Sequence, residues 1–420
     1  MARKMKDSGI EWIGEIPEGW EVGQIGQLYS ERRTKVSDKD YPPLSVTMKG
    51  ILPQLSTAAK TDAHDDRKLV CKGDFAINSR SDRRGSCGIS EQDGSISLIN
   101  TVLQPRGEMS PGYYNWLFHT SMFADEFYKW GHGIVDDLWT TGWSDMKKIS
   151  VPVPSKCEQK QLAEHLNFEC SNIDTILSKT RFSIEEYKKL KQAVITQAVT
   201  KGVRGKREMK DSGVEWIGEI PEEWNKCKLK NISIDIGDGL HGTPKFDDSG
   251  EVYFINGNNF SSEYVEPKFD TKKLCLEESL NYPKPELTEQ TIMISLNGSY
   301  GKVCLYRYFP MLLGKSAGYI TLLPSINRRY VRYYLSSTPA QIIMTLSLNG
   351  TTIPNLSLNT LYNFPTILPP ASEQAEIADY LDAKCAEIDK LIAKKEQLVK
   401  ELENYKKSLI YEVVTGKREV

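Results

Sequence analysis

Several short polar stretches of this 420-residue chain carry side chains able to bind an anion or the edge of a nucleic-acid base. Arginine and lysine bind phosphate or the O6 and N7 atoms of guanine, asparagine pairs with adenine, and threonine binds phosphate. The candidates are Arg80, Arg83, Arg84, His241, Asn256, Asn258, Asn259, Asn297, Lys302, Lys315, Thr351, Thr352 and Asn355. For His241 a hydrogen-bonded turn histidine is an equally good interpretation.

The distribution of charge supports this chemistry, although the net charge is only −2. From Gln290 to Ser372 the sequence contains no Asp or Glu, while basic residues and tyrosines are frequent. An acid-free, Arg- and Tyr-rich surface suits a phosphate backbone. A smaller basic cluster consists of Arg67, Lys68, Lys72, Arg80, Arg83 and Arg84. The alternative is a solvated charged face, with the tyrosines in the core or in strands.

The sequence offers no catalytic residue and no metal site. Gly314-Lys315-Ser316 resembles the end of a phosphate-binding loop, but the glycine required earlier in that motif is replaced by Phe309. Neither Pro-Pro pair lies in the Asn- or Asp-Pro-Pro-aromatic loop of amine methyltransferases. The eight cysteines form no CxxC pair and the five histidines are scattered, so we expect free, buried thiols and no zinc.

A sixteen-residue block occurs twice in the chain. Met5 to Trp20 reads MKDSGIEWIGEIPEGW, and Met209 to Trp224 reads MKDSGVEWIGEIPEEW, at an offset of 204. Such a match indicates a tandem duplication, which allows one polypeptide to form a pseudo-symmetric molecule. We call each block a strap, and we expect its tryptophans to hold it against the helices and domains.

A second repeat predicts two long helices. Glu158 to Thr200 aligns without a gap onto Glu373 to Thr415, and both segments lack Gly and Pro. Their apolar residues recur every seven positions, which is typical of a coiled-coil seam. The predicted pairing residues are Leu166, Ile173, Leu177, Thr180, Ile184, Leu381, Ile388, Ile392, Lys395 and Val399.

Polar residues interrupt the two seams at matching places, first at Thr180 and Lys395 and then at Lys191 and Lys406. The first pair lies near the middle of each segment, so antiparallel pairing would bring Thr180 against Lys395. The alternative is that each segment is an ordinary long surface helix with a few tolerated polar sites.

The order is therefore strap, globular region, long helix, and then the same again. The predicted boundaries are 1–153 for the first strap and domain, 154–204 for the central helix, 205–368 for the second strap and domain, and 369–420 for the last helix. Short apolar runs bounded by turn residues predict strands with interspersed helices. The expected class is α+β, with two dissimilar domains separated by two long antiparallel coiled-coil helices in a pseudo-two-fold repeat.

The chain resembles the DNA-specificity (S) subunits of type I restriction–modification systems over essentially its whole length. The likeness rests on the strap SGIEWIGEIPEGW and its copy, on the helix entries VPVPSKCEQKQLAEHL and ILPPASEQAEIADYL, and on KGDFAINSR, GSISLINTVLQP, GDGLHGTPKFDDSG and GTTIPNLSLNTL. It implies two target-recognition domains that each read half of a bipartite, asymmetric site on double-stranded DNA, with the helices as a ruler between them.

The resemblance also implies two methyltransferase (M) subunits on the helices and restriction (R) subunits in the full complex. Adenine methylation with S-adenosylmethionine would then belong to the M partners, and ATP and Mg to the R partners, so that this chain needs no cofactor and is not an enzyme. We expect a cytoplasmic protein, because the sequence shows neither a membrane span nor a secretory signal. The alternatives are a coiled-coil scaffold whose inserts bind protein, or an enzyme with an unrecognised active site.

Overall fold

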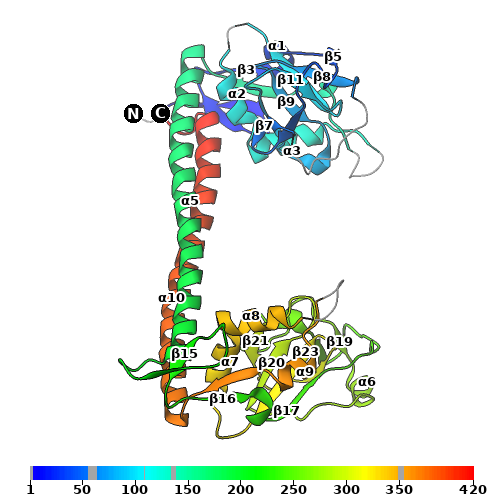
Figure 1. The fold of residues 1–420 in the computed structure, drawn as a ribbon. Coiled ribbons are helices and arrows are strands. Elements are labelled where there is room, and N and C mark those ends of the chain that lie inside the picture. Colours follow the sequence, from blue (N-terminus) through cyan, green and yellow to red (C-terminus); the bar gives the residue numbers. More distant parts are fainter. Residues whose placement is uncertain (1–2, 55–63, 108, 134–138, 349–353) are drawn as a thin grey trace. The chain divides into compact units, whose positions relative to one another are not determined.

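The computed structural model describes residues 3–54, 64–107, 109–133, 139–348 and 354–420. It contains two compact units: the first unit is Met1–Arg181 with Gln397–Val420, and the second unit is Phe182–Glu396. The division between them crosses both long helices, α5 (Lys156–Lys201) and α10 (Ala371–Val414) (Figure 1). Each unit therefore combines one strap, one globular domain and half of each helix.

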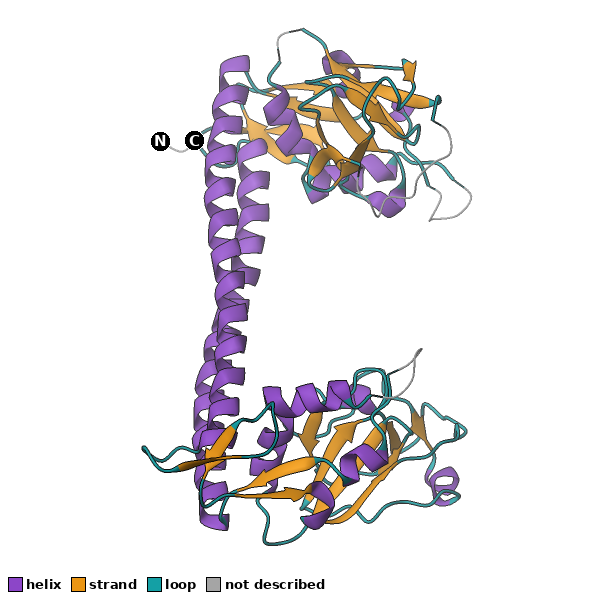
Figure 2. Ribbon diagram, viewed as in Figure 1, coloured by secondary structure: helices purple, strands orange, loops and turns teal. Residues whose placement is uncertain are grey.

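The domain of the first unit is built on a four-stranded sheet in the order β10-β9-β12-β4, beside a three-stranded antiparallel sheet in the order β11-β8-β5 (Figure 2). Strap strands β1 and β2 pair with each other, and β3 pairs with β13, so the domain begins and ends at one place. The bounds are β1 Met5–Ile10, β2 Gly14–Pro17, β3 Glu21–Gln24, α1 Ile25–Leu28, β4 Tyr29–Glu31, β5 Lys35–Val36, β6 Leu44–Thr47, β7 Gly50–Pro53, β8 Arg67–Val70, β9 Phe75–Asn78, β10 Cys87–Ile89, β11 Gly94–Ile96, β12 Asn100–Pro105, α2 Pro111–Phe118, α3 Ser121–Lys129, α4 Trp143–Met146 and β13 Ser150–Val153.

The second unit repeats this plan. Its four-stranded sheet has the order β21-β20-β23-β17. These strands correspond in turn to β10, β9, β12 and β4 of the first sheet. The three-stranded sheet of the second unit, β19-β18-β22, differs because β18 and β22 run parallel. The bounds are β14 Met209–Asp211, β15 Glu219–Pro221, β16 Asn225–Lys228, β17 Ser233–Asp238, β18 Val252–Ile255, β19 Lys273–Leu274, α6 Leu276–Leu280, β20 Thr291–Ser295, β21 Val303–Leu305, β22 Met311–Leu313, β23 Ala317–Leu322, α7 Arg328–Ser336, α8 Thr338–Leu346, α9 Leu358–Tyr362 and β24 Pro365–Leu368. Two inserts with dissimilar sequences thus form four-stranded sheets with the same strand order.

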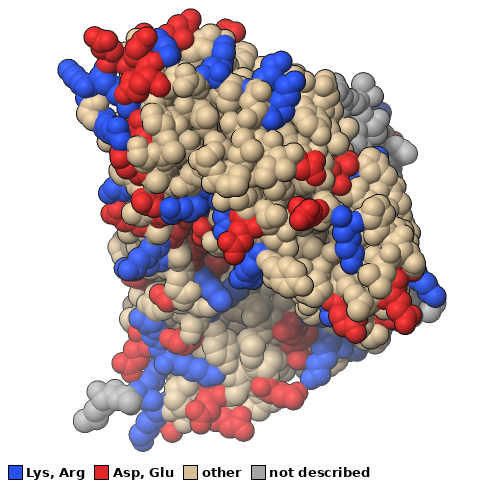
Figure 3. All heavy atoms as spheres, turned by 90° about the horizontal axis from the view of Figure 1, so that it is seen from below, with Lys and Arg blue, Asp and Glu red and all other residues tan. Residues whose placement is uncertain are grey.

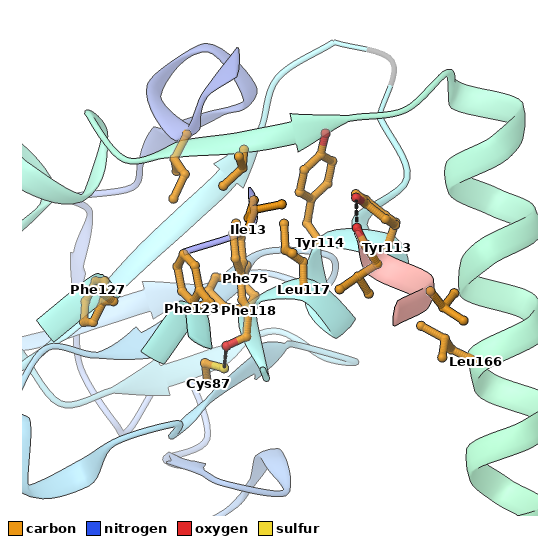
Figure 4. Close-up of a cluster of buried hydrophobic side chains, with 14 of the residues drawn as sticks. Ile13, Phe75, Cys87, Tyr113, Tyr114, Leu117, Phe118, Phe123, Phe127 and Leu166 are labelled. Carbon is orange, nitrogen blue, oxygen red and sulfur yellow. Dashed lines mark hydrogen bonds between the residues drawn. The ribbon is translucent and has the colours of Figure 1, made fainter. Parts of the chain in front are cut away.

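Aromatic side chains join the first domain to its helices. Phe118 from α2 and Phe123 from α3 lie 4.4 Å apart between ring centroids, under the sheet residue Phe75 (Figure 4). The Tyr113 hydroxyl donates a hydrogen bond of 2.7 Å to the carbonyl of Val414 at the end of α10. This cluster is continuous with the apolar face of α5, so the sheet, the short helices and the long helices share one core.

The long helices pair antiparallel within each unit, as predicted. In the first unit Lys406 of α10 lies 2.6 Å from Asp174 of α5, and in the second unit Lys191 lies 2.6 Å from Asp389. These contacts are equivalent, because an offset of 215 relates Asp174 to Asp389 and Lys191 to Lys406. The lysines that interrupt the apolar seam therefore bind carboxylates of the partner helix.

The seam residues predicted from the seven-residue repeat are buried, except Lys395 and Val399, which are half-buried. Lys395 lies over the Tyr187 ring in the second unit, with its Nζ 5.7 Å from the ring centroid. Thr180 is buried in the first unit. The predicted contact between Thr180 and Lys395 crosses the division between the units and stays a prediction.

Equivalent residues fix the start of each long helix. The buried side chain of Gln159 donates to the carbonyl of Pro154 and accepts from the amide of Ser110, which precedes α2. Gln374 makes the same two bonds with Pro369 and Asn327, the latter preceding α7. One glutamine in each unit therefore joins a long helix to the first short helix of its domain.

The straps are held by an arginine, a tryptophan and a glutamate in each unit. In the second unit Arg207 lies over the Trp224 ring at 5.2 Å and pairs with Glu373, which also accepts from the Trp224 indole N–H at 3.0 Å. In the first unit Arg3 lies over the Trp20 ring at 5.4 Å and pairs with Glu158. Trp20 and Trp224 thus hold the straps, as predicted.

The other strap tryptophans differ between the units. Trp12 is buried and packs edge-on against Phe123, with ring centroids 6.0 Å apart. Trp216 is 44% exposed, and the third residue of α8 is the small Ala340 where the third residue of α3 is Phe123. The cysteines also depart from expectation: all eight are free, but only four are buried, since Cys157 is exposed and Cys71, Cys227 and Cys275 are half-buried.

Candidate DNA interface

Five of the predicted DNA-binding residues lie on loops at equivalent positions in the sheets of the two units. Arg80, Arg83 and Arg84 lie on the loop between β9 and β10, and Asn297 and Lys302 lie on the corresponding loop between β20 and β21. Each loop contacts the segment that precedes the last short helix of its domain. This contact is the bridge from Arg80 to Thr140 in the first unit and from Asn297 to Asn355 in the second.

In the first unit the arginine loop borders a hollow of about 750 Å³. Its other walls come from β6, the β6–β7 turn and the start of β12. Arg84 is held in place, since it pairs with Asp125 at 2.8 Å and lies 5.3 Å from the centroid of the Tyr128 ring. Arg83 is 68% exposed on its side chain, and its ion pair with the adjacent Asp82 is 3.5 Å long. The hollow therefore has a cationic rim.

Buried polar residues shape the loop from below. The Asn78 side chain accepts from the amide of Arg80 at 3.0 Å and so sets the turn that begins the loop. Arg67, counted in the basic cluster of the sequence, is buried and donates to the side chain and carbonyl of Ser95. Burial lowers the pKa of Arg67. Arg67 therefore has a structural role, and the exposed cations of the cluster include Arg83 and Arg84.

In the second unit three asparagines and a lysine come together. The Asn297 amide donates to the carbonyl of Lys315 at 3.4 Å, and the hydroxyl of Ser316 donates to the side chain of Asn256 at 3.0 Å. Asn355 lies beside Asn297 and is exposed. The result is an amide-rich surface around the Gly314-Lys315-Ser316 turn.

Other candidates have structural roles or different locations. Asn259 is buried, and its side chain accepts from the amide of Asn256 and donates to Thr271 and Glu266, so the turn accounts for its presence. The Nε2 atom of His241 lies 2.7 Å from a carboxylate oxygen of Asp238, which fits the turn interpretation. Asn258 is exposed. Lys302 lines a separate hollow beside α8, and Thr351 and Thr352 lie outside the described residues.

The acid-free stretch does not form the unpaired basic surface that its sequence predicts. Arg329 pairs with Asp379 and Asp382 of α10, and Arg332 lies 3.9 Å from both Glu263 and Asp382. The neighbouring tyrosines 330, 333 and 334 are buried, in line with the alternative interpretation. Acids distant in sequence pair with arginines of this stretch, and basic and acidic side chains are interspersed over the face shown in Figure 3.

Comparison with known proteins indicates the function of these loops. A model of the type I restriction modification DNA specificity domain matches residues 221–403. The type I restriction enzyme MjaVIII specificity subunit of Methanocaldococcus jannaschii is 26% identical over 425 residues, covering 96% of this chain and 93% of that protein. Residues 221–403 thus match the type I DNA specificity domain, and the whole chain is similar to type I specificity subunits. It is therefore a sequence-specific DNA-recognition subunit, and a scaffold that binds only protein is not favoured.

Solved structures share the fold of this specificity subunit. A chain from a structure of the type I restriction–modification system aligns with a TM-score of 0.74 at 14% identity, covering 95% of this chain and 98% of that chain. The HsdS subunit of Thermoanaerobacter tengcongensis aligns with a TM-score of 0.54 at 16% identity, covering 96% and 98%. Within the described residues no helix is long and apolar enough to cross a membrane, and no cluster of His, Cys, Asp and Glu suits a metal ion.

Proposed function

We propose that this subunit reads a bipartite, asymmetric DNA site, one half with each domain, and positions M and R subunits for adenine methylation or cleavage. The observation that carries the proposal is the shared position of the β9–β10 and β20–β21 loops in two sheets of the same order. Equivalent loops with different side chains can present one binding mode to two different sequences. A DNA-reading subunit works where the DNA is, so we place it in the cytoplasm.

The chain itself is proposed to be non-catalytic. Its candidate interface consists of arginines, amides and a lysine, which bind phosphates and base edges but offer no nucleophile beside a general base. S-adenosylmethionine is then bound by the M subunits, and ATP and Mg by the R subunits. The side chains of the candidate interface need only hold the DNA sequence in register.

The long helices provide a surface for the M subunits. In the first unit Leu398 and Tyr405 of α10 are exposed apolar residues seven positions apart beside the buried seam, and Ile176 of α5 is also exposed. In the second unit the exposed apolar residues at the same place in the seven-residue repeat are Leu391 of α10 and Leu190 of α5. The opposite flank of the pair carries charges such as Arg181 and Glu403, which pair with each other. A coiled coil with one apolar flank is suited to packing against further helices.

A domain exchange tests the DNA-reading proposal. Residues 225–368 are replaced with the second insert of another family member, and the methylated motif of the host is read by sequencing. We expect one half of the motif to change while the other half and its methylation persist. A change in both halves, or in neither, would contradict independent reading by two domains.

A binding measurement separates DNA reading from the scaffold alternative. The assembled S–M complex should bind duplex DNA that contains its motif with an affinity that falls as salt rises, because phosphate contacts release counterions.

Leu398→Glu should prevent assembly with M, whereas Gln397→Glu, one position away on the outer face, should not. Assembly without any salt-dependent DNA binding would favour the scaffold.

A further inference from the structure

We infer that the two domains use different base chemistry. The first unit reads guanine through Arg83, and the second reads adenine through the amides of the bridge partners Asn297 and Asn355, so that the second half-site is specified mainly at A·T pairs. This inference rests on the proposed function, since it names what the shared loop position reads in each unit. It depends on three observations, which concern the bridge residues, the positions of the arginines and the availability of the amides.

The bridge at the shared loop position differs in chemistry between the units. The first unit places a guanidinium and a hydroxyl there, in Arg80 and Thr140. The second unit places two amides there, in Asn297 and Asn355. Because these pairs occupy the same place in the two domains, the exchange changes which hydrogen-bond pattern faces a bound base.

Arginine is the usual reader of guanine, but the β20–β21 loop of the second unit contains no arginine. The second unit contains six arginines, and each one contacts a carboxylate or a carbonyl of its own unit. The partners are Glu376 for Arg204, Glu373 and Glu223 for Arg207, Glu266 for Arg307, the carbonyl of Glu289 for Arg328, Asp379 and Asp382 for Arg329, and Glu263 and Asp382 for Arg332. All of these arginines except Arg307 lie on α7 or shortly after the end of α5. The loop that corresponds to the arginine loop of the first unit therefore offers no arginine for guanine.

In the first unit the arginine loop does offer a free head group. Arg84 is fixed by Asp125 and the Tyr128 ring, whereas Arg83 extends into solvent and contacts only its sequence neighbour Asp82 among the ion pairs of the described residues. A guanidinium donates two parallel hydrogen bonds to O6 and N7 of guanine. Arg83 can reorient toward such a partner without breaking a contact with another element.

The amides of Asn297 and Asn355 favour adenine because of their hydrogen-bond pattern. An amide offers one donor and one acceptor, which match the N7 acceptor and N6 donor of adenine. Guanine presents acceptors at both N7 and O6, so the amide oxygen would oppose O6. Asn355 is exposed, and the only protein bond of the Asn297 side chain found among the described residues is the 3.4 Å contact to Lys315. Both amides are therefore available for a base.

The test is the host methylome with wild-type and variant subunits. Arg83→Gln should relax or alter a guanine position in one half-site, with a loss of preference of about tenfold or more. Asn355→Asp should weaken an adenine position in the other half-site and raise acceptance of cytosine, because a carboxylate accepts from cytosine N4. Glu91→Gln and Asn281→Asp, exposed changes elsewhere in the two units, should leave the motif unchanged.

Assembly with M and thermal melting of each variant establish that it folds. The inference is overturned if the wild-type motif specifies mostly G·C pairs in the half read by residues 225–368, or if Arg83→Gln and Asn355→Asp both assemble and leave the motif intact. The domain exchange separates failure of the base assignment from failure of the proposed function. If the exchange still changes only one half of the methylated motif, the proposed function stands although the base assignment fails. If it changes both halves, the proposed function itself fails.

Discussion

At the scale of residues, the two units hold their straps with the same three residue types, but the glutamate is more deeply buried in the second unit. Both hold the strap with an arginine stacked on a tryptophan and paired with a glutamate at the start of a long helix. In the second unit Glu373 is fully buried and has two partners, whereas the side chain of Glu158 in the first unit is 24% exposed. Equivalent residues are therefore expected to differ in their contribution to stability.

Glu373→Gln should destabilise the protein more than its matched control Glu158→Gln. Loss of the buried carboxylate removes the charge partner of Arg207 and weakens the bond from Trp224, at a cost of about 2 to 3 kcal/mol in the free energy of unfolding. The partly exposed Glu158 should cost less than about 1 kcal/mol. Urea unfolding of both variants measures the difference, and equal losses would show that burial of Glu373 does not set its contribution.

Thiol reactivity should separate one cysteine from the buried ones. Burial raises the pKa of Cys170 to about 11 and that of Cys304 to about 12. At pH 8 both groups stay protonated in the folded state and are shielded, so neither provides much of the reactive thiolate. We expect a maleimide to label the exposed Cys157 first, and Cys157→Ser to remove the fast phase. Rapid labelling of Cys170 or Cys304 in the native protein would contradict their burial.

At the scale of elements, the repeats predict the helices well and the domains poorly. The duplicated segments 158–200 and 373–415 lie within two residues of α5 and α10 at each end, because a seven-residue apolar pattern without Gly or Pro is a strong local signal. The common sheet order of the domains is invisible in their dissimilar inserts. It depends on pairing between distant strands, such as β12 with β4, which no local pattern encodes.

The candidate interface, like the sheets, could be predicted only in part from the sequence. Arg83 and Asn355 could be selected by residue type, but residue type could not exclude Asn259, whose bonds close a turn. Nor could an acid-free stretch reveal that Arg329 meets acids of α10, about fifty residues away in the chain. Sequence therefore identifies the kinds of side chain available, and long-range packing determines which of them remain free.

Exchanging the charges of Lys191 and Asp389 tests the role of the polar seam residues. Asp389→Lys alone places two cations together on the helix pair and should weaken it, with a loss of about 0.5 to 1 kcal/mol in unfolding free energy. Adding Lys191→Asp should recover most of that loss. The equivalent exchange at Asp174 and Lys406 in the first unit is the matched control and should behave alike. A double variant no more stable than Asp389→Lys would show that the ion pair has no part in pairing.

At the scale of the whole molecule, duplication separates a repeated frame from two variable inserts. The straps, the glutamine contacts and the lysine–aspartate pairs recur at fixed offsets, while the loops that carry the candidate DNA contacts differ. A frame that recurs can keep one geometry while each insert changes its own half-site. The two 43-residue segments align without a gap, and a rigid rod is the simplest way to fix a distance.

If the long helices set the spacing between half-sites, lengthening α5 should lengthen the DNA spacer. Four residues inserted near Thr180 add about 6 Å along the helix, which is close to two base pairs at ~3.4 Å each. Four residues slightly exceed one turn, so they also rotate the C-terminal part of the helix by about 40°. Two base pairs rotate DNA by roughly 70° in the same sense. That mismatch is small enough for the domain junctions at Pro154 and Gly202 to absorb.

The variant should therefore methylate both original half-sites with a spacer longer by one or two pairs. A four-residue insertion after Gly205, between the helix and the second strap, is the matched control, because it adds the same length of chain without extending the coiled coil. Its spacer should stay unchanged. The methylomes of both variants decide the matter: an unchanged spacer in the Thr180 variant, with methylation retained, would show that the helices do not measure the distance. In that case the spacing would have to be set by the M subunits that hold the domains on DNA.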